Sequence, residues 1–327
     1  MSETLTKKEQ KAIKKEKSAE AKAKLKARRE YLKAKAAKYK RQPGDRIDGR
    51  RLRKVQGMIR FMPYLMPQRC DALNYFADSF DITEAEKFCR EKVNSGMMNF
   101  SLLHLLIAAY VRVVSQRPEI NRFIAGQEIY AHHSIDVVMT VKKHMAVDSD
   151  ETCIKVCFEP TDTVDEVYKK FNDTIRESVG DAEDTDFDGF TDTFQKIPRW
   201  VLRLFMRILN FLDYHGKLPL ALLEISPFHG SMIITSMGSL GIKPIYHHIY
   251  NFGTLPLFIS YGAKRAVYEL NENGEPEKHK YIDVKIVTDE RVCDGFHYAS
   301  AFKMMKKIMA NPKQLDTPPE TVVEDCL

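Results

Sequence analysis

Apolar residues recur along most of the chain, either with the period of a helix or with the alternation of a strand. The stretch MNFSLLHLLIAAYVRVVSQRP is apolar almost throughout and ends at Pro118, which predicts a buried helix over 98–118. Another helix is predicted over 198–216, with Pro198 at its start and Gly216 at its end. Further helices are predicted over 163–179 and 295–312, and strands over 132–143, 152–160, 231–242, 255–265 and 281–292. This mixture indicates an α/β domain.

The first 42 residues follow neither pattern. They contain 16 Lys and Arg against 5 Glu, a net charge of +11, so the other 285 residues carry 6 − 11 = −5 of the total of +6. The region is rich in Lys and Ala, lacks Gly and Pro, and has few large apolar residues. Such a composition favours a helix but offers no apolar stripe to bury, so we expect a solvated helix or a disordered arm.

Two interpretations of this arm stay open. Its charge suits contact with nucleic acid or an anionic membrane, whereas few aromatic residues interleave, which favours a solvated extension without a dedicated partner. The turn residues Gln42–Asp45 close it. We therefore divide the chain into a basic arm over 1–45 and one folded domain over 46–327.

Length and composition narrow the class further. A chain of 327 residues with 44% hydrophobic residues buries a full core. Its six cysteines show no metal-binding spacing and no secretory leader is evident, so we expect reduced thiols, no metal site and a cytoplasmic location. Charges interrupt every apolar stretch before 18 residues, which predicts no membrane span.

The run DERVCDG (289–295) lies between the last predicted strand and the last predicted helix. It resembles the motif His-x-x-x-Asp-Gly of the chloramphenicol acetyltransferase superfamily, which includes the catalytic domain of the acyltransferase component of 2-oxoacid dehydrogenase complexes. Asp294 and Gly295 match the motif, and Glu290 stands in place of its histidine.

Other stretches carry the same resemblance. IITSMGSLGI (233–242) is similar to the strand and turn that present a hydroxyl in this family, and by that match the hydroxyl belongs to Ser236. RPEINRFIAGQEIYAHHSIDVVMTV (117–141) and PLFISYGAKR (256–265) are similar to further family segments, so the resemblance covers 46–312. It implies a mixed sheet flanked by helices, and a trimer with each active site between two subunits.

The resemblance also implies a chemistry. An acyl group leaves the thioester of coenzyme A, a co-substrate rather than a permanently bound cofactor, for a hydroxyl or thiol of a small-molecule acceptor. A base removes the acceptor's proton, and a hydroxyl such as that of Ser236 stabilises the oxyanion. In the family the motif aspartate pairs with an arginine and fixes the loop, which assigns that role to Asp294 with Arg60 as its partner.

Glu290 divides the interpretation. A glutamate in water has a pKa near 4.3 and is a feeble base at neutral pH. Burial between subunits would make it a stronger base, and His297, just after Gly295, is a possible auxiliary group, although packing at a helix start explains that histidine equally. In the third interpretation, Glu290 pairs with Arg291 in an active site that has lost its activity.

Two further segments have competing interpretations. DTDFDGFTDTFQ (184–195) nearly fits a calcium-binding loop, but Gln195 replaces the bidentate carboxylate, so an acidic surface loop is favoured.

The helix over 198–212 carries Arg199, Arg203 and Arg207 on one face, together with the chain's single tryptophan. This suits a membrane-surface helix, but a core helix with its arginines toward solvent is favoured because core strands follow directly.

The sequence thus predicts a trimeric, chloramphenicol-acetyltransferase-like protein that transfers acyl groups from coenzyme A through an altered site of Glu290, Asp294 and Ser236. The alternative is a catalytically inactive trimeric protein that keeps the scaffold for binding. A third possibility makes contact of the basic arm with nucleic acid or anionic membrane the primary function.

Overall fold

The structure is a computed structural model, and it describes residues 7–142, 151–180 and 197–326. Its strands form a six-stranded and a three-stranded sheet. The strands are β1 Gly49–Arg51, β2 Leu73–Asp81, β3 Arg122–Ala125, β4 Glu128–His132, β5 Ile135–Lys142, β6 Glu151–Phe158, β7 Met232–Ser236, β8 Leu257–Leu270 and β9 Pro276–Asp289. The helices are α1 Lys7–Ala37, α2 Gly57–Leu65, α3 Thr83–Asn94, α4 Leu102–Gln116, α5 Val164–Gly180, α7 Arg199–Tyr214, α8 Leu220–Ile225 and α9 Gly295–Ala310.

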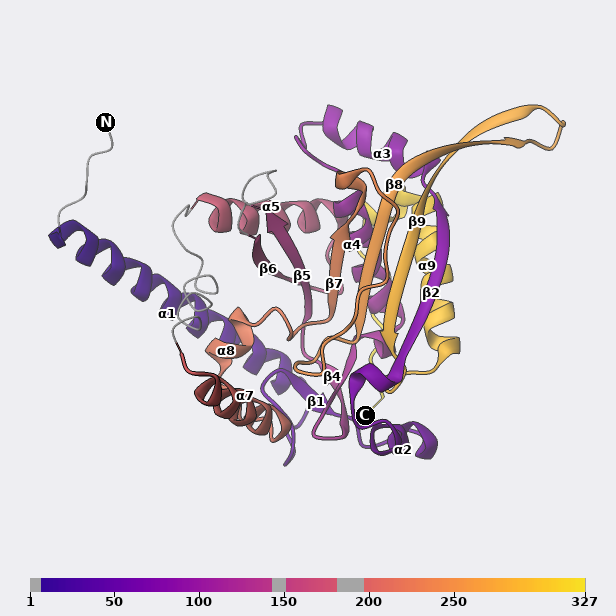
Figure 1. Ribbon diagram of the computed structural model, residues 1–327. Helices are drawn as coiled ribbons and strands as arrows, with labels where there is room; N and C mark the ends of the chain where they lie inside the picture. The colour runs from indigo at the N-terminus through magenta and orange to yellow at the C-terminus, as the bar shows by residue number, and fades with distance from the viewer. Residues whose placement is uncertain (1–6, 143–150, 181–196, 327) are drawn as a thin grey trace.

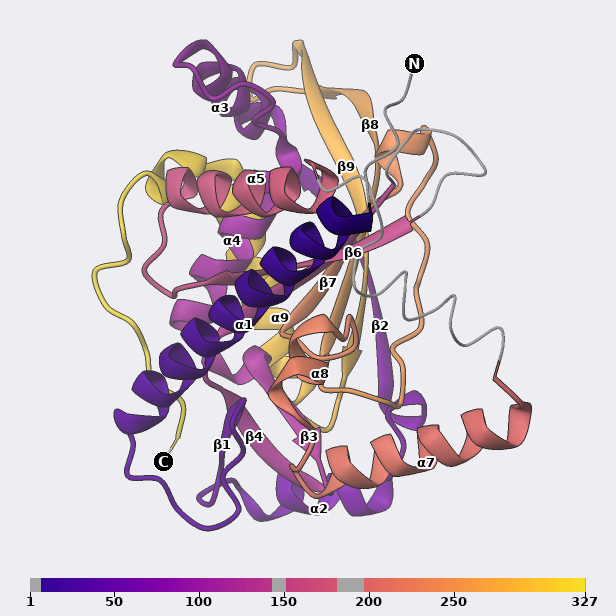
Figure 2. The same cartoon turned by 90° about the vertical axis from the view of Figure 1, so that its left-hand side faces the viewer.

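The larger sheet has the order β2-β9-β8-β7-β5-β6 and is mixed. β7 runs parallel to both β5 and β8, while the other neighbours are antiparallel. α4 and α9 pack against each other on one face, with α5 beside α4 (Figures 1 and 2). The predicted mixed sheet flanked by helices is therefore confirmed.

Most predicted elements are present, with shifted ends. The predicted strand over 132–143 is split, since β4 ends at His132 and β5 begins at Ile135. β8 and β9 are longer than predicted and continue as a hairpin that projects from the body to the upper right in Figure 1. The sequence 184–195, for which a calcium-binding loop was weighed, lies outside the described residues.

The basic arm forms the long helix α1, and its second half packs on the domain. Leu32 is only 2% exposed, and it clusters with leucines near α8. Arg28 forms ion pairs with Asp136 (2.6 Å) and Glu224 (3.1 Å). The expectation of an arm with nothing to bury is thus wrong for this half, because a few apolar residues and buried ion pairs hold it in place.

The helix α7 also differs from its prediction as a core helix. Of its sixteen residues only Asp213 is buried, whereas Trp200 is 69% and Phe211 is 61% exposed. The helix lies along the lower edge of the molecule, outside the layers that α4 and α9 form (Figures 1 and 2). An apolar stripe in the sequence was correctly identified, but the domain does not cover it.

Candidate active site

The loop that carries Glu290 follows β9 directly and leads into α9. Its backbone is tied to the residue before β2, because the Glu290 N–H donates to the Ala72 carbonyl oxygen (2.9 Å). The side chain is half-buried, and it forms no hydrogen bond or ion pair with any described residue. Its carboxylate therefore has no partner among the described residues.

The adjacent Asp289 is the residue that fixes the loop. It is fully buried, and both of its carboxylate oxygens accept hydrogen bonds from Arg291 (2.8 and 2.7 Å). Arg69, from the turn before β2, donates a third bond (3.1 Å). The Tyr298 hydroxyl donates to the Asp289 main-chain oxygen (3.0 Å), which links the loop to α9. The weighed pairing of Glu290 with Arg291 is thus replaced by a buried cluster of Asp289 with two arginines.

Asp294 has a different role from the one predicted. It is the N-cap of α9, where its carboxylate accepts hydrogen bonds from the His297 main-chain N–H (3.0 Å) and lies 2.7 Å from the His297 ring Nδ1. The main-chain bond, aided by the ring, lowers the pKa of Asp294. Arg60 lies exposed on α2 and forms no ion pair with Asp294 among the described residues. Among the described residues the predicted Asp294–Arg60 pair is absent, because the carboxylate of Asp294 is taken up by the cap of α9.

Gly295 and His297 lie in the first turn of α9. Gly295 is the first helical residue and is exposed, with nothing packed where a Cβ would be. His297 is half-buried, and its ring contacts the carboxylate of Asp294 rather than that of Glu290. The histidine therefore supports the helix start, which was one of its two interpretations.

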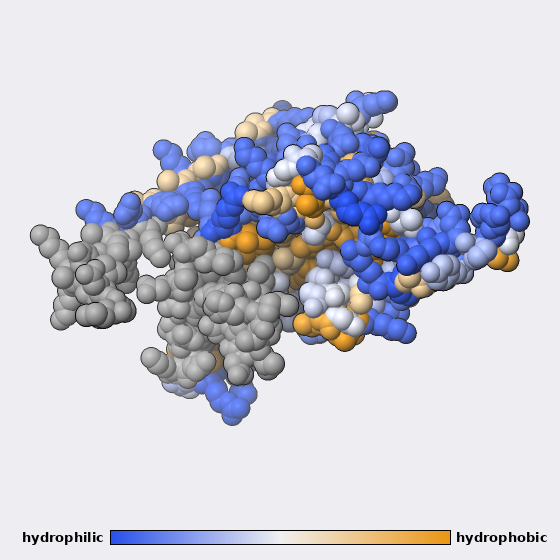
Figure 3. Space-filling view, turned by 90° about the horizontal axis from the view of Figure 1, so that it is seen from above, coloured by the Kyte–Doolittle hydropathy of each residue, from blue (hydrophilic) through white to orange (hydrophobic). Residues whose placement is uncertain are grey.

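Ser236 lies at the other end of the sheet, at the end of β7. It lines a cavity of about 830 Å³ between the end of β7, the middle of β8, α3 and the start of α4. Hydrophobic residues gather near the middle of this end of the molecule, with hydrophilic surface above and to the right of them (Figure 3). The charged residues of the lining are Arg90, Lys264, Lys280 and Glu86, two positive charges in excess. Such a lining suits a ligand with anionic groups.

Ser236 and Glu290 do not meet within one chain. Ser236 pairs in register with Tyr261 of β8, which pairs with Val284 of β9. Glu290 is six residues further along, and at about 3.3 Å per strand residue the two side chains are roughly 20 Å apart along the sheet. One copy of the chain therefore does not bring the two predicted catalytic groups together.

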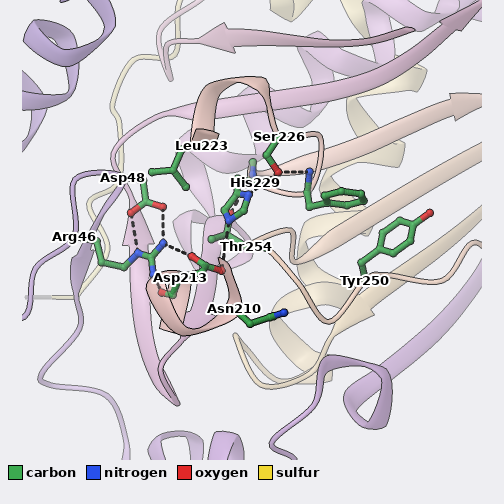
Figure 4. Close-up of polar contacts among 12 residues, drawn as sticks. Arg46, Asp48, Asn210, Asp213, Leu223, Ser226, His229, Tyr250 and Thr254 are labelled. Atoms are coloured by element: carbon green, nitrogen blue, oxygen red, sulfur yellow. Dashed lines mark hydrogen bonds and ion pairs between the residues drawn. The ribbon is translucent and has the colours of Figure 1, made fainter. Parts of the chain in front are cut away.

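A buried polar network, not predicted from the sequence, lies beside α7 (Figure 4). Arg46 donates to Asp48 (2.9 Å) and to Asp213 (2.8 Å), and His229 lies 3.4 Å from Asp213 and 2.7 Å from the Ser226 hydroxyl. The order Ser–His–Asp is that of a nucleophile, a base and an orienting acid. However, His229 is only 4% exposed, and burial lowers its pKa, so the ring is neutral and enclosed.

This network is structural, and sequence spacing gave no signal for it, because 167 residues separate Arg46 from Asp213. Among the described residues, no group of three or more His, Cys, Asp or Glu could hold a metal ion. The helices that the structure describes include none that is long and apolar enough to cross a membrane.

No protein-family model matches the chain, and no curated protein sequence matches it. Solved structures are similar to it. A probable dihydrolipoamide acetyltransferase from Listeria monocytogenes 4b F2365 matches with a TM-score of 0.51 and 12% identity, over 88% of this chain and 100% of that one. A truncated catalytic core of the 2-oxoacid dehydrogenase multienzyme complex from Thermoplasma acidophilum matches with a TM-score of 0.47 and 13% identity, over 80% and 99%.

A chloramphenicol acetyltransferase is similar with a TM-score of 0.47 and 9% identity, over 80% of this chain and 99% of that one. The likeness to the Listeria protein shows that this chain has the fold of a dihydrolipoamide acetyltransferase. The fold that the sequence resemblance implies is thereby confirmed. That Glu290 stands in place of the family's histidine stays a prediction from the sequence motif.

Proposed function

We propose that the protein transfers an acyl group from coenzyme A to a hydroxyl or thiol of a small acceptor, at a site that two copies of the chain build together. The observation that supports this most is the place of Ser236, in a cavity with excess positive charge within an acetyltransferase fold. The cavity has room for the pantetheine arm of coenzyme A, and the exposed Arg90 suits its phosphates, with Lys264 and Lys280, which both pair with Glu86, in the same lining.

In this proposal Glu290 of one copy takes the proton of the acceptor, and Ser236 of another copy donates a hydrogen bond to the oxyanion. The acceptor oxygen or sulfur forms a bond to the acyl carbon, and the coenzyme A thiolate leaves. The roughly 20 Å between the two groups in one chain supports a shared site. Large apolar side chains exposed near the sheet give two copies a surface to bury, including Tyr75, Leu240, Ile242, Ile245 and Phe296.

The test is release of the coenzyme A thiol from acetyl-coenzyme A with a panel of hydroxyl and thiol acceptors. We expect turnover by the wild type and a loss of about 10²–10⁴-fold in Glu290→Gln, because a positioned base is removed. Glu290→His should keep activity. Glu84→Gln is the matched control, since Glu84 is exposed on α3 and pairs only with its neighbour Lys87 (2.6 Å). Activity in Glu290→His alone would mean that the chain keeps the scaffold without the catalysis.

A mixture of inactive variants tests the shared site. Glu290→Gln copies retain Ser236, and Ser236→Ala copies retain Glu290, so mixed assemblies contain intact sites only if each site draws on two copies. Random mixing should restore about a quarter of the wild-type activity. No restoration in assemblies shown to be mixed would place both groups in one chain and overturn the shared site.

A further inference from the structure

The residues that the structure describes cover only part of the apolar surface of α7. On one side Leu209 and Leu212 pack against the leucine cluster around α8. A second stripe faces outward, and its members follow one another at intervals of four, four and three residues. They are Trp200 (69% exposed), Leu204 (50%), Ile208 (48%) and Phe211 (61%). Residues at this spacing share one face of a helix, so the stripe is continuous.

A row of positive charge runs beside this stripe. Arg199, Arg203 and Arg207 are exposed, lie four residues apart, and form no ion pair with any described residue. The helix has one acidic residue, Asp213, which is buried against Arg46. An outward apolar stripe flanked by arginines, with a tryptophan on it, is the pattern of helices that lie in the surface of a membrane.

The end of α7 is firmly anchored, so its exposed stripe is a stable feature of the fold. Arg46 donates to the Asp213 main-chain oxygen (2.5 Å) as well as to its carboxylate, and it also binds Asp48 (Figure 4). His229 contacts Asp213 from the other side. Together these groups fix the orientation in which α7 presents Trp200 and Phe211.

A second apolar helix lies at the same end of the molecule. α2 exposes Met58 (70%), Phe61 (53%) and Leu65 (58%), and Arg60 beside them is exposed as well. Both helices lie at the lower end of the molecule in Figures 1 and 2. One side chain joins them, because Gln127 accepts a hydrogen bond from Tyr214 of α7 (3.0 Å) and donates to the main chain of α2 (3.5 Å).

We propose that α7, with α2 beside it, docks on the surface of an anionic lipid bilayer. The phosphates of the lipid head groups complement the arginine row, and the acyl chains receive the apolar stripe. A second copy of the same face fits less well, since a twofold contact brings the row of Arg199, Arg203 and Arg207 near itself. The proposal does not depend on acyl transfer.

Docking would bring the loop of Glu290 close to the bilayer. Arg291, next to Glu290, donates hydrogen bonds to the main-chain oxygens of Met66 (3.1 Å) and Pro67 (3.2 Å), which directly follow α2. The candidate base Glu290 is therefore next to a residue that is hydrogen-bonded to the segment directly after α2. An acceptor that partitions into the bilayer surface would reach Glu290 without leaving it.

Trp200, the only tryptophan of the chain, serves as the probe. The full chain is mixed with phosphatidylcholine vesicles containing phosphatidylglycerol, and with vesicles of phosphatidylcholine alone, at about 0.1 M salt. We expect co-sedimentation and a blue shift of tryptophan emission with the anionic vesicles, and weaker binding to the neutral ones. Arg199→Gln/Arg203→Gln/Arg207→Gln should weaken binding roughly a hundredfold, at about fivefold for each arginine.

Leu204→Glu/Phe211→Glu keeps Trp200 and should abolish the blue shift. Leu270→Glu is the matched control, because Leu270 is 74% exposed on the hairpin far from α7, and this variant should bind like the wild type. Co-sedimentation without a blue shift would mean that the basic helix α1 alone binds the vesicles, and it would overturn the proposal. The proposal would also be overturned if the wild type did not bind vesicles and instead formed an oligomer that the Leu204→Glu/Phe211→Glu variant dissociates.

Discussion

The helices α4 and α7 are both rich in apolar residues, yet they occupy opposite environments. Thirteen of the fifteen residues of α4 are buried, whereas α7 buries one of sixteen. α4 carries a single arginine, Arg112, which donates to the main chain of the C-terminal segment, while α7 carries three exposed arginines in one row. The comparison shows that the spacing of charges, rather than apolar content, distinguishes a core helix from a helix that leaves an apolar face exposed.

The largest expected difference between the two helices is in stability. Leu106→Ala in α4 removes a fully buried side chain, so we expect the free energy of unfolding to fall by about 2–5 kcal/mol. Leu204→Ala in α7 removes a half-exposed one, and the change should stay within about 0.5 kcal/mol. Urea unfolding of both variants measures the difference. Equal losses would mean that the outward stripe of α7 is covered within the folded protein.

The overall fold was predictable because its core elements have strong patterns. Continuous apolar runs gave α4, β8 and β9, and their order together with the Asp294–Gly295 motif gave the fold. The hydrophobic patterns do not predict which elements contact each other across long sequence separations. Arg28 of the arm binds Asp136, 108 residues away, and neither residue stands out among the many charges of the chain.

The sequence names candidate site residues but not their contacts. The resemblance names Glu290 and Ser236 as site residues, and the apolar strand patterns place Glu290 just after β9 and Ser236 at the end of β7. The partner of the loop, Arg69, lies 220 residues before Asp289, and no spacing rule connects them. Asp294 was assigned an arginine by resemblance, whereas its position before α9 makes it a helix cap.

The second prediction concerns His104, at the start of α4. Burial lowers the pKa of His104 to about 4, and its Nδ1 accepts a hydrogen bond from the Ser101 N–H (3.1 Å). An unfolded histidine takes up its proton near pH 6.5, before the folded one does, so stability falls as the pH falls between 6.5 and 4. The loss through this residue amounts to roughly 3 kcal/mol.

His104→Gln should remove that part of the pH dependence, which urea unfolding at several pH values measures. Glutamine keeps an acceptor near the Ser101 N–H without a titrating ring. The stability of wild type and variant should therefore converge or cross as the pH is lowered toward 4. Parallel curves over this range would contradict a neutral, buried His104.

The smallest expected effect concerns the anchor of α7, and it occurs at lower pH. Burial by itself would raise the pKa of Asp213, but the contacts with His229 and Arg46 outweigh it and hold that pKa below its usual range. Because the folded pKa lies below the unfolded value near 3.9, the stabilisation is present above pH 4 and is lost as the pH falls through the folded pKa. Asp213→Asn should thus lower the free energy of unfolding by about 1–3 kcal/mol at pH 6 and by less below pH 3.

The matched control is Asp173→Asn on α5, where an exposed aspartate lies 3.7 Å from Arg176 and the change should stay within about 0.5 kcal/mol. If Asp213→Asn behaved like this control at pH 6, the Arg46 network would not hold α7 in place. The outward stripe would then be one position of a loosely attached helix. A clear loss of stability at pH 6 that becomes smaller in acid would instead show that the buried Arg46–Asp213 ion pair holds α7 in place. α7 would then be fixed to the fold by this ion pair, whereas α4 is held by its buried apolar side chains.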